Sequence, residues 1–192
     1  MTILILGLVL FLGVHSLAFL APAWRQRQVD RLGNTAWQAL GGLVALVGLV
    51  AIAWGYGQAR LEPFGLYAPP LWPRHLGLLI MLLAFPLFFA AYLPGRIKEA
   101  VGHPMVTAVI LWAIAHLVAN GNLADLVLFG SFLLWALVDR VSLFYRIAPA
   151  VQGAPPGKAN DLIAIVLGLG FYLGFLFWAH AWLFGVSPLG TA

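Results

Sequence analysis

The chain has 192 residues, of which 63% are hydrophobic and only 8% are charged. Soluble domains carry about 25% charged residues because their surfaces need polar cover, so this composition predicts an integral membrane protein. The lack of cysteine excludes disulfides, thiolate metal sites, iron–sulfur clusters and covalent heme attachment. The net charge of +4 is weak evidence for nucleic acid, and we expect no nucleic-acid partner.

Continuous apolar stretches predict six membrane-spanning helices within one domain that covers residues 1–192. A spanning helix needs about 20 apolar residues. The six stretches are residues 2–21, 36–56, 75–93, 104–119, 123–144 and 162–186. The sequence Asn120-Gly121-Asn122 predicts a tight turn, so the fourth and fifth stretches form an antiparallel hairpin. The predicted fold class is therefore an all-α bundle of six transmembrane helices.

The basic residues predict that both termini lie on the outer, periplasmic side of a bacterial inner membrane. Lys and Arg concentrate in the cytoplasmic loops of membrane proteins. With the N-terminus outside, the cytoplasmic loops contain eight of the ten basic residues: Arg25, Arg27, Arg31, Arg96, Lys98, Arg140, Arg146 and Lys158. The outer loops contain Arg60 and Arg74. No basic residue precedes the first apolar stretch, so we expect an uncleaved span rather than a secretory signal.

Histidines are the main candidates for chemistry. His15, His116 and His180 lie within predicted spans, whereas His75 and His103 lie at the starts of spans. Ionisable side chains at membrane depth are rare and usually mark a site that faces the bundle interior. For any one of them, the alternative is a neutral imidazole that only hydrogen-bonds a neighbouring backbone carbonyl. Three in one small bundle favour at least one being a ligand.

The setting of these histidines favours axial heme ligation over zinc binding. Catalytic zinc requires three protein ligands close together, but the three intramembrane histidines lie on different helices with no acid beside them. Heme requires one or two imidazoles in an apolar slot, and aromatic residues such as Trp112 lie one turn from His116. At about 1.5 Å per residue, His116 and His180 lie nearer the outer face than His15, which favours pairing those two.

Two patterns give expectations about helix ends and helix packing. His103 precedes His116 by about 140° around an ideal helix, so the two residues cannot share one face. We therefore expect His103 at a helix start or in contact with a lipid head group. Gly170 and Gly174 form a GxxxG pattern, which usually indicates close packing of two transmembrane helices.

Polar residues also gather at both ends of the predicted hairpin. Asn120, Asn122 and Asp125 lie at its outer end, close in sequence to His116. They are typical of turn and helix-cap residues, and a polar mouth is the alternative. At the inner end, Asp139 and Arg140 predict an interfacial ion pair.

The string GHPM at residues 102–105, followed by LWAIAHLVANGNL at residues 111–123, resembles the central signature of the NnrU family. GVHS at residues 13–16 also resembles that family, and length, span number and motif order agree over essentially the whole chain. NnrU proteins are bacterial membrane proteins linked to nitrite and nitric oxide reduction in denitrification. Their plant relative, 15-cis-zeta-carotene isomerase, is a heme b protein that isomerises a polyene double bond.

This resemblance implies a heme b cofactor whose iron is held by His15 and His116. His180, His103 and Trp112 would be further cofactor-binding residues, the two histidines as alternative ligands. The implied pair differs from the pair that the depth arithmetic favours, His116 with His180.

The chain departs from the family pattern at two positions. The plant relative has a cysteine three residues before the second axial histidine, where this chain has Ala113, so a thiolate ligand switch cannot form here. The family usually has arginine before His-Pro, where this chain has Gly102.

We therefore expect a heme-dependent redox protein or isomerase that acts on a lipophilic or small-molecule substrate, with membrane lipid around it and with catalytic residues unassigned. One alternative is an S-adenosylmethionine-dependent membrane methyltransferase, because such enzymes share the basic-x-His-Pro theme of His103-Pro104. Those enzymes also carry a Glu-Glu motif further on, whereas residues 140–161 contain no glutamate. The other alternative is a non-enzymatic scaffold or assembly factor for a respiratory reductase.

Overall fold

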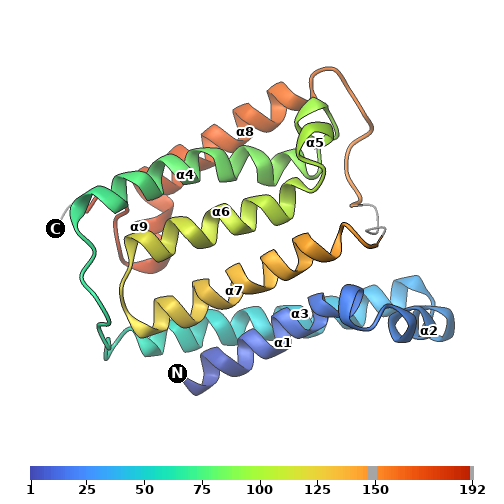
Figure 1. The fold of residues 1–192 in the computed structure, drawn as a ribbon, viewed down its shortest axis with the longest axis horizontal. Helices are drawn as coiled ribbons and strands as arrows, with labels where there is room; N and C mark the ends of the chain where they lie inside the picture. Colours follow the sequence, from blue (N-terminus) through green and yellow to red (C-terminus); the bar gives the residue numbers. More distant parts are fainter. Residues whose placement is uncertain (147–150, 191–192) are drawn as a thin grey trace. The chain divides into compact units, whose positions relative to one another are not determined.

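The structure is a computed structural model that describes residues 1–146 and 151–190. Every predicted apolar stretch is helical (Figure 1). The corresponding elements are α1 (Thr2–Leu20), α3 (Asn34–Ala59), α4 (Leu71–Ala90), α6 (Pro104–Ala119), α7 (Leu123–Ser142) and α8 (Asn160–Gly174), the last continued by a π-helical turn η1 (Phe175–Ala179) and α9 (His180–Phe184). Two short helices, α2 (Pro22–Leu32) and α5 (Arg96–Val101), lie between them.

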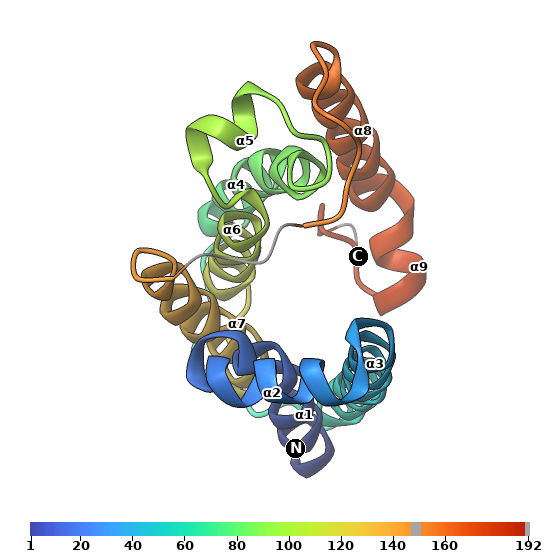
Figure 2. The same cartoon turned by 90° about the vertical axis from the view of Figure 1, so that its right-hand side faces the viewer.

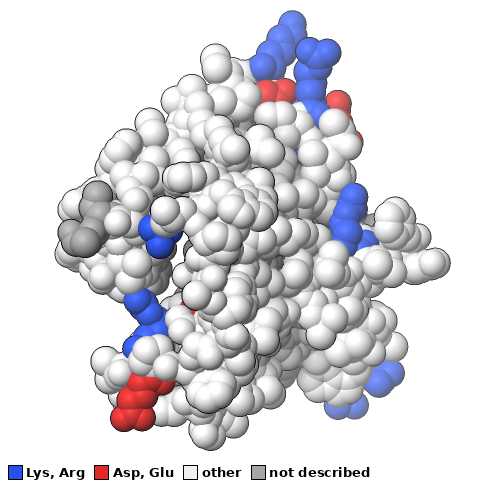
Figure 3. Space-filling model, turned by 60° about the vertical axis from the view of Figure 1, so that its left-hand side comes forward, with Lys and Arg blue, Asp and Glu red and all other residues white. Residues whose placement is uncertain are grey.

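Four of these segments are long and apolar enough to cross a membrane: α1, α3, α4 and the continuous segment Asn160–Phe184. The all-helical fold is thus confirmed for the described residues, and four helices fit a membrane protein, while the count of six spans stays a prediction. Helix α6 is apolar but has 16 residues, and α7 carries Asp125, Asp139 and Arg140. On the face in Figure 3, charged residues form small groups that leave wide uncharged areas between them.

The helices form two compact units, each built from two separate stretches of chain. Unit one contains Met1–Tyr67 and Gly121–Arg146, and unit two contains Ala68–Asn120 and Ile147–Ala192. In unit one, α1 packs against α3 and α7, with α2 across the end of the α1–α3 pair (Figure 2). In unit two, α4 packs between α6 and α8.

Glycines bring the two main helices of unit one into backbone contact. A Cβ atom added at Gly7 would lie 2.6 Å from the backbone nitrogen of Ile52, and one at Gly48 would lie 2.7 Å from that of Phe11. Real Cβ atoms do not approach so closely, so any larger residue at these positions forces α1 and α3 apart. Small residues commonly permit this close approach in membrane helices, where dispersion contacts replace the hydrophobic effect.

The close contact in unit two uses a different glycine from the predicted pair. A Cβ atom at Gly168 would lie 2.5 Å from the backbone nitrogen of Pro86 on α4, whereas Cβ atoms at Gly170 and Gly174 would meet no described atom within 4 Å. The prediction of close packing at the GxxxG pattern is therefore wrong. Two residues turn a helix by about 200°, so Gly168 faces α4 and Gly170 faces away.

A tight turn places His103 directly before α6. Gly102 has φ 74° and ψ −58°, and the backbone N–H of His103 donates to the carbonyl of Val101 at 2.9 Å. This is a three-residue γ-turn, a strained conformation that glycine adopts at the lowest cost. His103 is the N-cap residue and Pro104 the first residue of α6, which confirms the predicted position of His103 at a helix start.

Candidate histidine sites

Unit two brings two of the three intramembrane histidines together. His116 lies near the end of α6, and His180 is the first residue of α9. Their ring centroids are 6.5 Å apart and their planes differ by 22°. Both side chains are half-buried. This is the pair that the depth arithmetic predicted, whereas His15, which the family resemblance pairs with His116, belongs to unit one.

Backbone carbonyls fix the tautomer of both rings. The Nδ1 atom of His116 lies 2.8 Å from the carbonyl oxygen of Trp112, and Nδ1 of His180 lies 2.6 Å from that of Val186. A carbonyl oxygen only accepts, so Nδ1 must donate in each case. The neutral ring then has its lone pair on Nε2, the arrangement found in metal-binding histidines whose other nitrogen donates to a second group.

The aromatic ring of Trp112, a predicted cofactor-binding residue, also contacts His116. The two ring centroids are 5.2 Å apart. Because the carbonyl of Trp112 accepts from the same imidazole, one residue fixes both the tautomer and one side of the ring. The predicted association of Trp112 with His116 is thus present in the structure.

A π-helical turn positions His180. Helix α8 widens into η1 over Phe175–Ala179 immediately before this residue, and α9 ends at Phe184, where the C-cap Gly185 has φ 69° and ψ 11°. The left-handed glycine reverses the chain, so the carbonyl of Val186 reaches back to His180. Single π-helical turns inside α-helices often occur at functional sites. The sequence did not predict the π-helical turn. The glycine that follows Phe184 is a sequence signal only for the end of α9.

In unit one, His15 has the same anchor but different neighbours. Its Nδ1 donates to the carbonyl of Phe11 at 2.6 Å, and the Phe11 ring centroid lies 4.4 Å from its own. Trp135 on α7 meets His15 edge-on, with centroids 6.2 Å apart. Among the described residues, the indole nitrogen of Trp135 is buried without a hydrogen-bond partner. An orphaned donor of this kind is unusual, and it lies on the ring that contacts His15.

A groove of about 230 Å³ opens beside His15 between α1, α2 and α3. Its lining is Val14, His15, Leu17, Ala18, Arg25, Trp37, Gln38, Gly41, Gly42 and Ala45. This volume is below the roughly 300–1,000 Å³ of typical small-molecule pockets. The groove therefore suits a head group or one end of a larger ligand rather than a whole macrocycle.

Unit two has a larger, almost entirely apolar groove of about 430 Å³. Its lining is Leu82, Leu83, Pro86, Leu87, Ile97, Leu111, Ile165 and Leu169. The lining contains no charged side chain, so it suits an apolar chain or ring.

The polar residues Asn120, Asn122 and Asp125 act as caps at the end of α6 and the start of α7. The backbone N–H of Asn122 donates to the carboxylate of Asp125 at 3.1 Å, which forms part of a capping box at the start of α7. The Tyr56 hydroxyl donates to the same carboxylate at 2.5 Å, and Asp125 is only 3% exposed. Asn120 donates from its amide to the carbonyl of His116 at 2.9 Å. The predicted turn and cap roles are confirmed.

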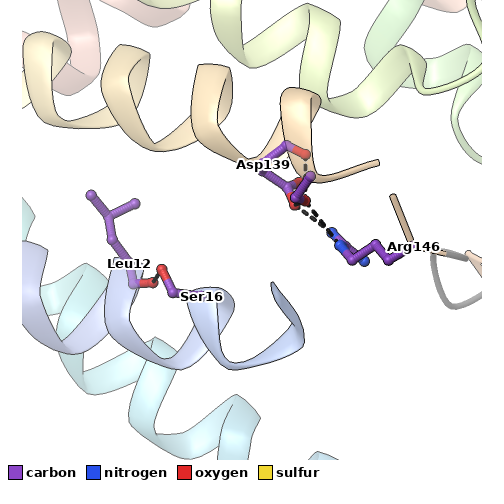
Figure 4. Close-up of polar contacts among 5 residues, drawn as sticks. Leu12, Ser16, Asp139 and Arg146 are labelled. Carbon is purple, nitrogen blue, oxygen red and sulfur yellow. Dashed lines mark hydrogen bonds and ion pairs between the residues drawn. The ribbon is translucent and has the colours of Figure 1, made fainter. Parts of the chain in front are cut away.

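Asp139 forms an ion pair with Arg146 (Figure 4), which the sequence did not predict, while the predicted pair of Asp139 with Arg140 stays a prediction. Arg146 lies beyond Ser142, the last residue of α7, and its side chain reaches back to Asp139. Arg146 also donates to Ser142 at 2.9 Å and lies over the ring of Phe19 on α1. The Arg146 side chain thus connects the C-terminal end of α7 with that of α1.

The donor chemistry fits heme better than a multi-ligand metal site. Within residues 1–146 and 151–190, no group of three His, Cys, Asp or Glu side chains could hold a metal ion. The structure brings two imidazoles together, those of His116 and His180, and one or two imidazoles are what a heme group requires of a protein.

Comparison with known proteins supports the resemblance noted in the sequence. The family model described as NnrU protein matches residues 3–188, which is nearly the whole chain. Neither a curated protein nor a solved structure matches.

Proposed function

The chain belongs to the NnrU protein family, and from that premise we propose that it binds heme b within the membrane through His116. The observation that carries this proposal is the pair of imidazoles in unit two. Their ring centroids lie 6.5 Å apart, and each ring has Nδ1 bonded to a carbonyl, so these two side chains would hold the group through Nε2. On this geometry the second ligand is His180, and the competing assignment is His15, which the family resemblance implies.

The chain's own residues prepare His116 and His180 for coordination. The carbonyls of Trp112 and Val186 hold the two rings in one tautomer and raise the basicity of Nε2. The indole of Trp112 limits rotation of the His116 ring and keeps water from one side of it. When bound, heme iron supplies one-electron redox chemistry and binding of small ligands such as nitrogen oxides.

The apolar groove of unit two supports a lipophilic substrate. Its lining offers dispersion contacts and no hydrogen bond, so it favours a hydrocarbon chain or polyene over a polar metabolite. We propose redox or isomerase-type chemistry on such a substrate, or on a small molecule in nitrite and nitric oxide reduction. Ala113 stands where the plant relative has its cysteine, so a change of iron ligand here would not use a thiolate.

We further propose a location in the bacterial inner membrane, with six spans and both termini outside. Hydropathy and length support four of the spans. Helices α6 and α7 are joined by the short turn at residues 120–122, and this hairpin would supply the remaining two. With this orientation α2 and α5 lie on the cytoplasmic side, where their arginine and lysine residues obey the positive-inside rule.

The absorption spectrum of detergent-purified protein, with a pyridine hemochrome assay, tests the heme proposal. We expect near-stoichiometric heme b, and we expect His116→Ala to remove or grossly alter its absorption while the protein stays in the membrane. His75→Ala is the matched control, because His75 lies at the start of α4 in the same unit. Colourless protein that also fails to take up added hemin would overturn the proposal and favour a scaffold role.

A further inference from the structure

The groove in unit one combines an unpaired cation with apolar walls. Arg25 is half-buried, whereas Arg27 and Arg31 on the same helix are exposed. Among the described residues, the guanidinium of Arg25 has neither an ion pair nor a hydrogen bond. A guanidinium withdrawn from water gains most from an anion placed beside it.

The position of the groove matches a membrane interface. Helix α2 has 11 residues, several of them charged, so it is too short and polar to span a membrane. Trp24 and Trp37 meet edge-on with centroids 5.8 Å apart, and tryptophan is enriched at the level of lipid head groups. His15 lies five residues before the end of α1, about 8 Å deeper along the helix axis. The groove therefore runs from the interface into the apolar layer.

The walls divide into a polar end and an apolar end. Arg25 and Gln38 offer donors at the interface, while Val14, Leu17 and Ala45 line the wall nearer the membrane interior. Gly42 leaves open space on the α3 side of the groove, because a Cβ atom added there would meet no described atom within 4 Å. The sequence of cation, amide and then apolar wall matches a phosphate, a glycerol ester and an acyl chain.

We propose that this groove binds one anionic phospholipid, with the phosphate at Arg25 and an acyl chain along α1 and α3. Basic pockets between membrane helices on the cytoplasmic side commonly bind anionic head groups. The volume of about 230 Å³ accommodates a head group, and the open side of the groove lets the chains continue into the bilayer. The occupant is independent of the heme proposed for unit two.

Native mass spectrometry of delipidated protein, titrated with phosphatidylglycerol or with phosphatidylcholine of the same acyl chains, tests this proposal. We expect one phosphatidylglycerol molecule to bind tightly and phosphatidylcholine to bind more weakly. Arg25→Gln should weaken phosphatidylglycerol binding about fivefold, the value of one basic residue near a membrane surface. Gly42→Leu should weaken both lipids by filling the groove without changing any charge.

Arg27→Gln is the matched control, since it removes the same charge from an exposed position on the same helix. Equal weakening by Arg25→Gln and Arg27→Gln would overturn the proposal in favour of general surface attraction. Displacement of the lipid by inorganic phosphate would overturn it in favour of a free anion. One-for-one displacement by added hemin would assign the groove to the cofactor instead. Heme content is measured on the same samples, so failure of the heme proposal remains distinguishable.

Discussion

The histidines of the two units share one local arrangement and differ in their neighbours. In both units Nδ1 donates to a backbone carbonyl, so the neutral ring has its lone pair on Nε2. In unit two a second imidazole lies 6.5 Å from His116, while in unit one His15 lines a groove with the guanidinium of Arg25. The hydrogen bond from Nδ1 to a backbone carbonyl therefore prepares an imidazole for binding. The side chains next to that imidazole decide which ligand the site suits.

The largest expected effect separates the two units directly. His180→Ala should lower hemin affinity at least about tenfold and change the absorption spectrum, because it removes one of two paired ligands. His15→Ala should leave both properties unchanged. Hemin titration followed by absorption measures the affinities. The reverse result, in which hemin affinity falls only in His15→Ala, would assign the iron to His15 and His116, the pair implied by the family resemblance. The two units would then not differ in the way proposed.

Removing the π-helical turn should have nearly as large an effect. Deletion of Leu176 takes one residue out of η1 and rotates the following residues by about 100° relative to α8. His180 then leaves His116, so hemin affinity should fall as it does in His180→Ala. Leu176→Ala keeps the residue count and serves as the control. If the deletion variant binds hemin normally, the π-helical turn has no part in placing the ligand.

Helix packing offers a reciprocal test with a smaller effect. Gly7→Ala and Gly168→Ala each force a Cβ atom into the backbone of a neighbouring helix, which should cost about 1–3 kcal/mol of stability. Gly7→Ala should mainly reduce phosphatidylglycerol binding in unit one, and Gly168→Ala should mainly reduce hemin binding in unit two.

Thermal unfolding in detergent measures the stability of both variants. Gly170→Ala is the control for both, because its Cβ atom has open space, and we expect a change within about 0.5 kcal/mol. If Gly7→Ala or Gly168→Ala lost both phosphatidylglycerol binding and hemin binding, the two units would not respond separately to packing defects.

The positions of the helices were predictable from sequence, whereas the faces they use were not. Residues 104–119 were predicted and found as α6 with the same bounds, because apolar runs and the proline at the helix start define it. In an apolar membrane helix, however, every face is apolar, so hydropathy does not reveal the packed side. The prediction therefore favoured the GxxxG glycines although Gly168 makes the contact.

The site was predictable in its residues and less so in its geometry. Depth counted along the helices indicated His116 with His180, whereas the family resemblance, to which the prediction gave more weight, implied His15 with His116. The anchor of His180 was not predictable, because it depends on η1 and on the reversal at Gly185. The partner of Asp139 was missed for a similar reason, as Arg146 lies beyond the end of α7 and only the fold brings it back.

The most local expected effect concerns the start of α7 in unit one, where the buried carboxylate of Asp125 accepts from both Tyr56 and Asn122. Tyr56→Phe removes one donor from this carboxylate and should cost about 1.5–3 kcal/mol, the usual value for a hydrogen bond to a charged group, with the lower end expected because Asn122 remains. Tyr92→Phe in unit two is the matched control, since its side chain is 41% exposed. Because Tyr56 belongs to unit one, hemin binding at His116 should not change in Tyr56→Phe. The temperature of thermal unfolding should fall. A Tyr56→Phe variant as stable as the unaltered protein would mean that the capping box alone holds Asp125. Tyr56 would then contribute packing against Phe129 rather than a stabilising hydrogen bond between α3 and α7.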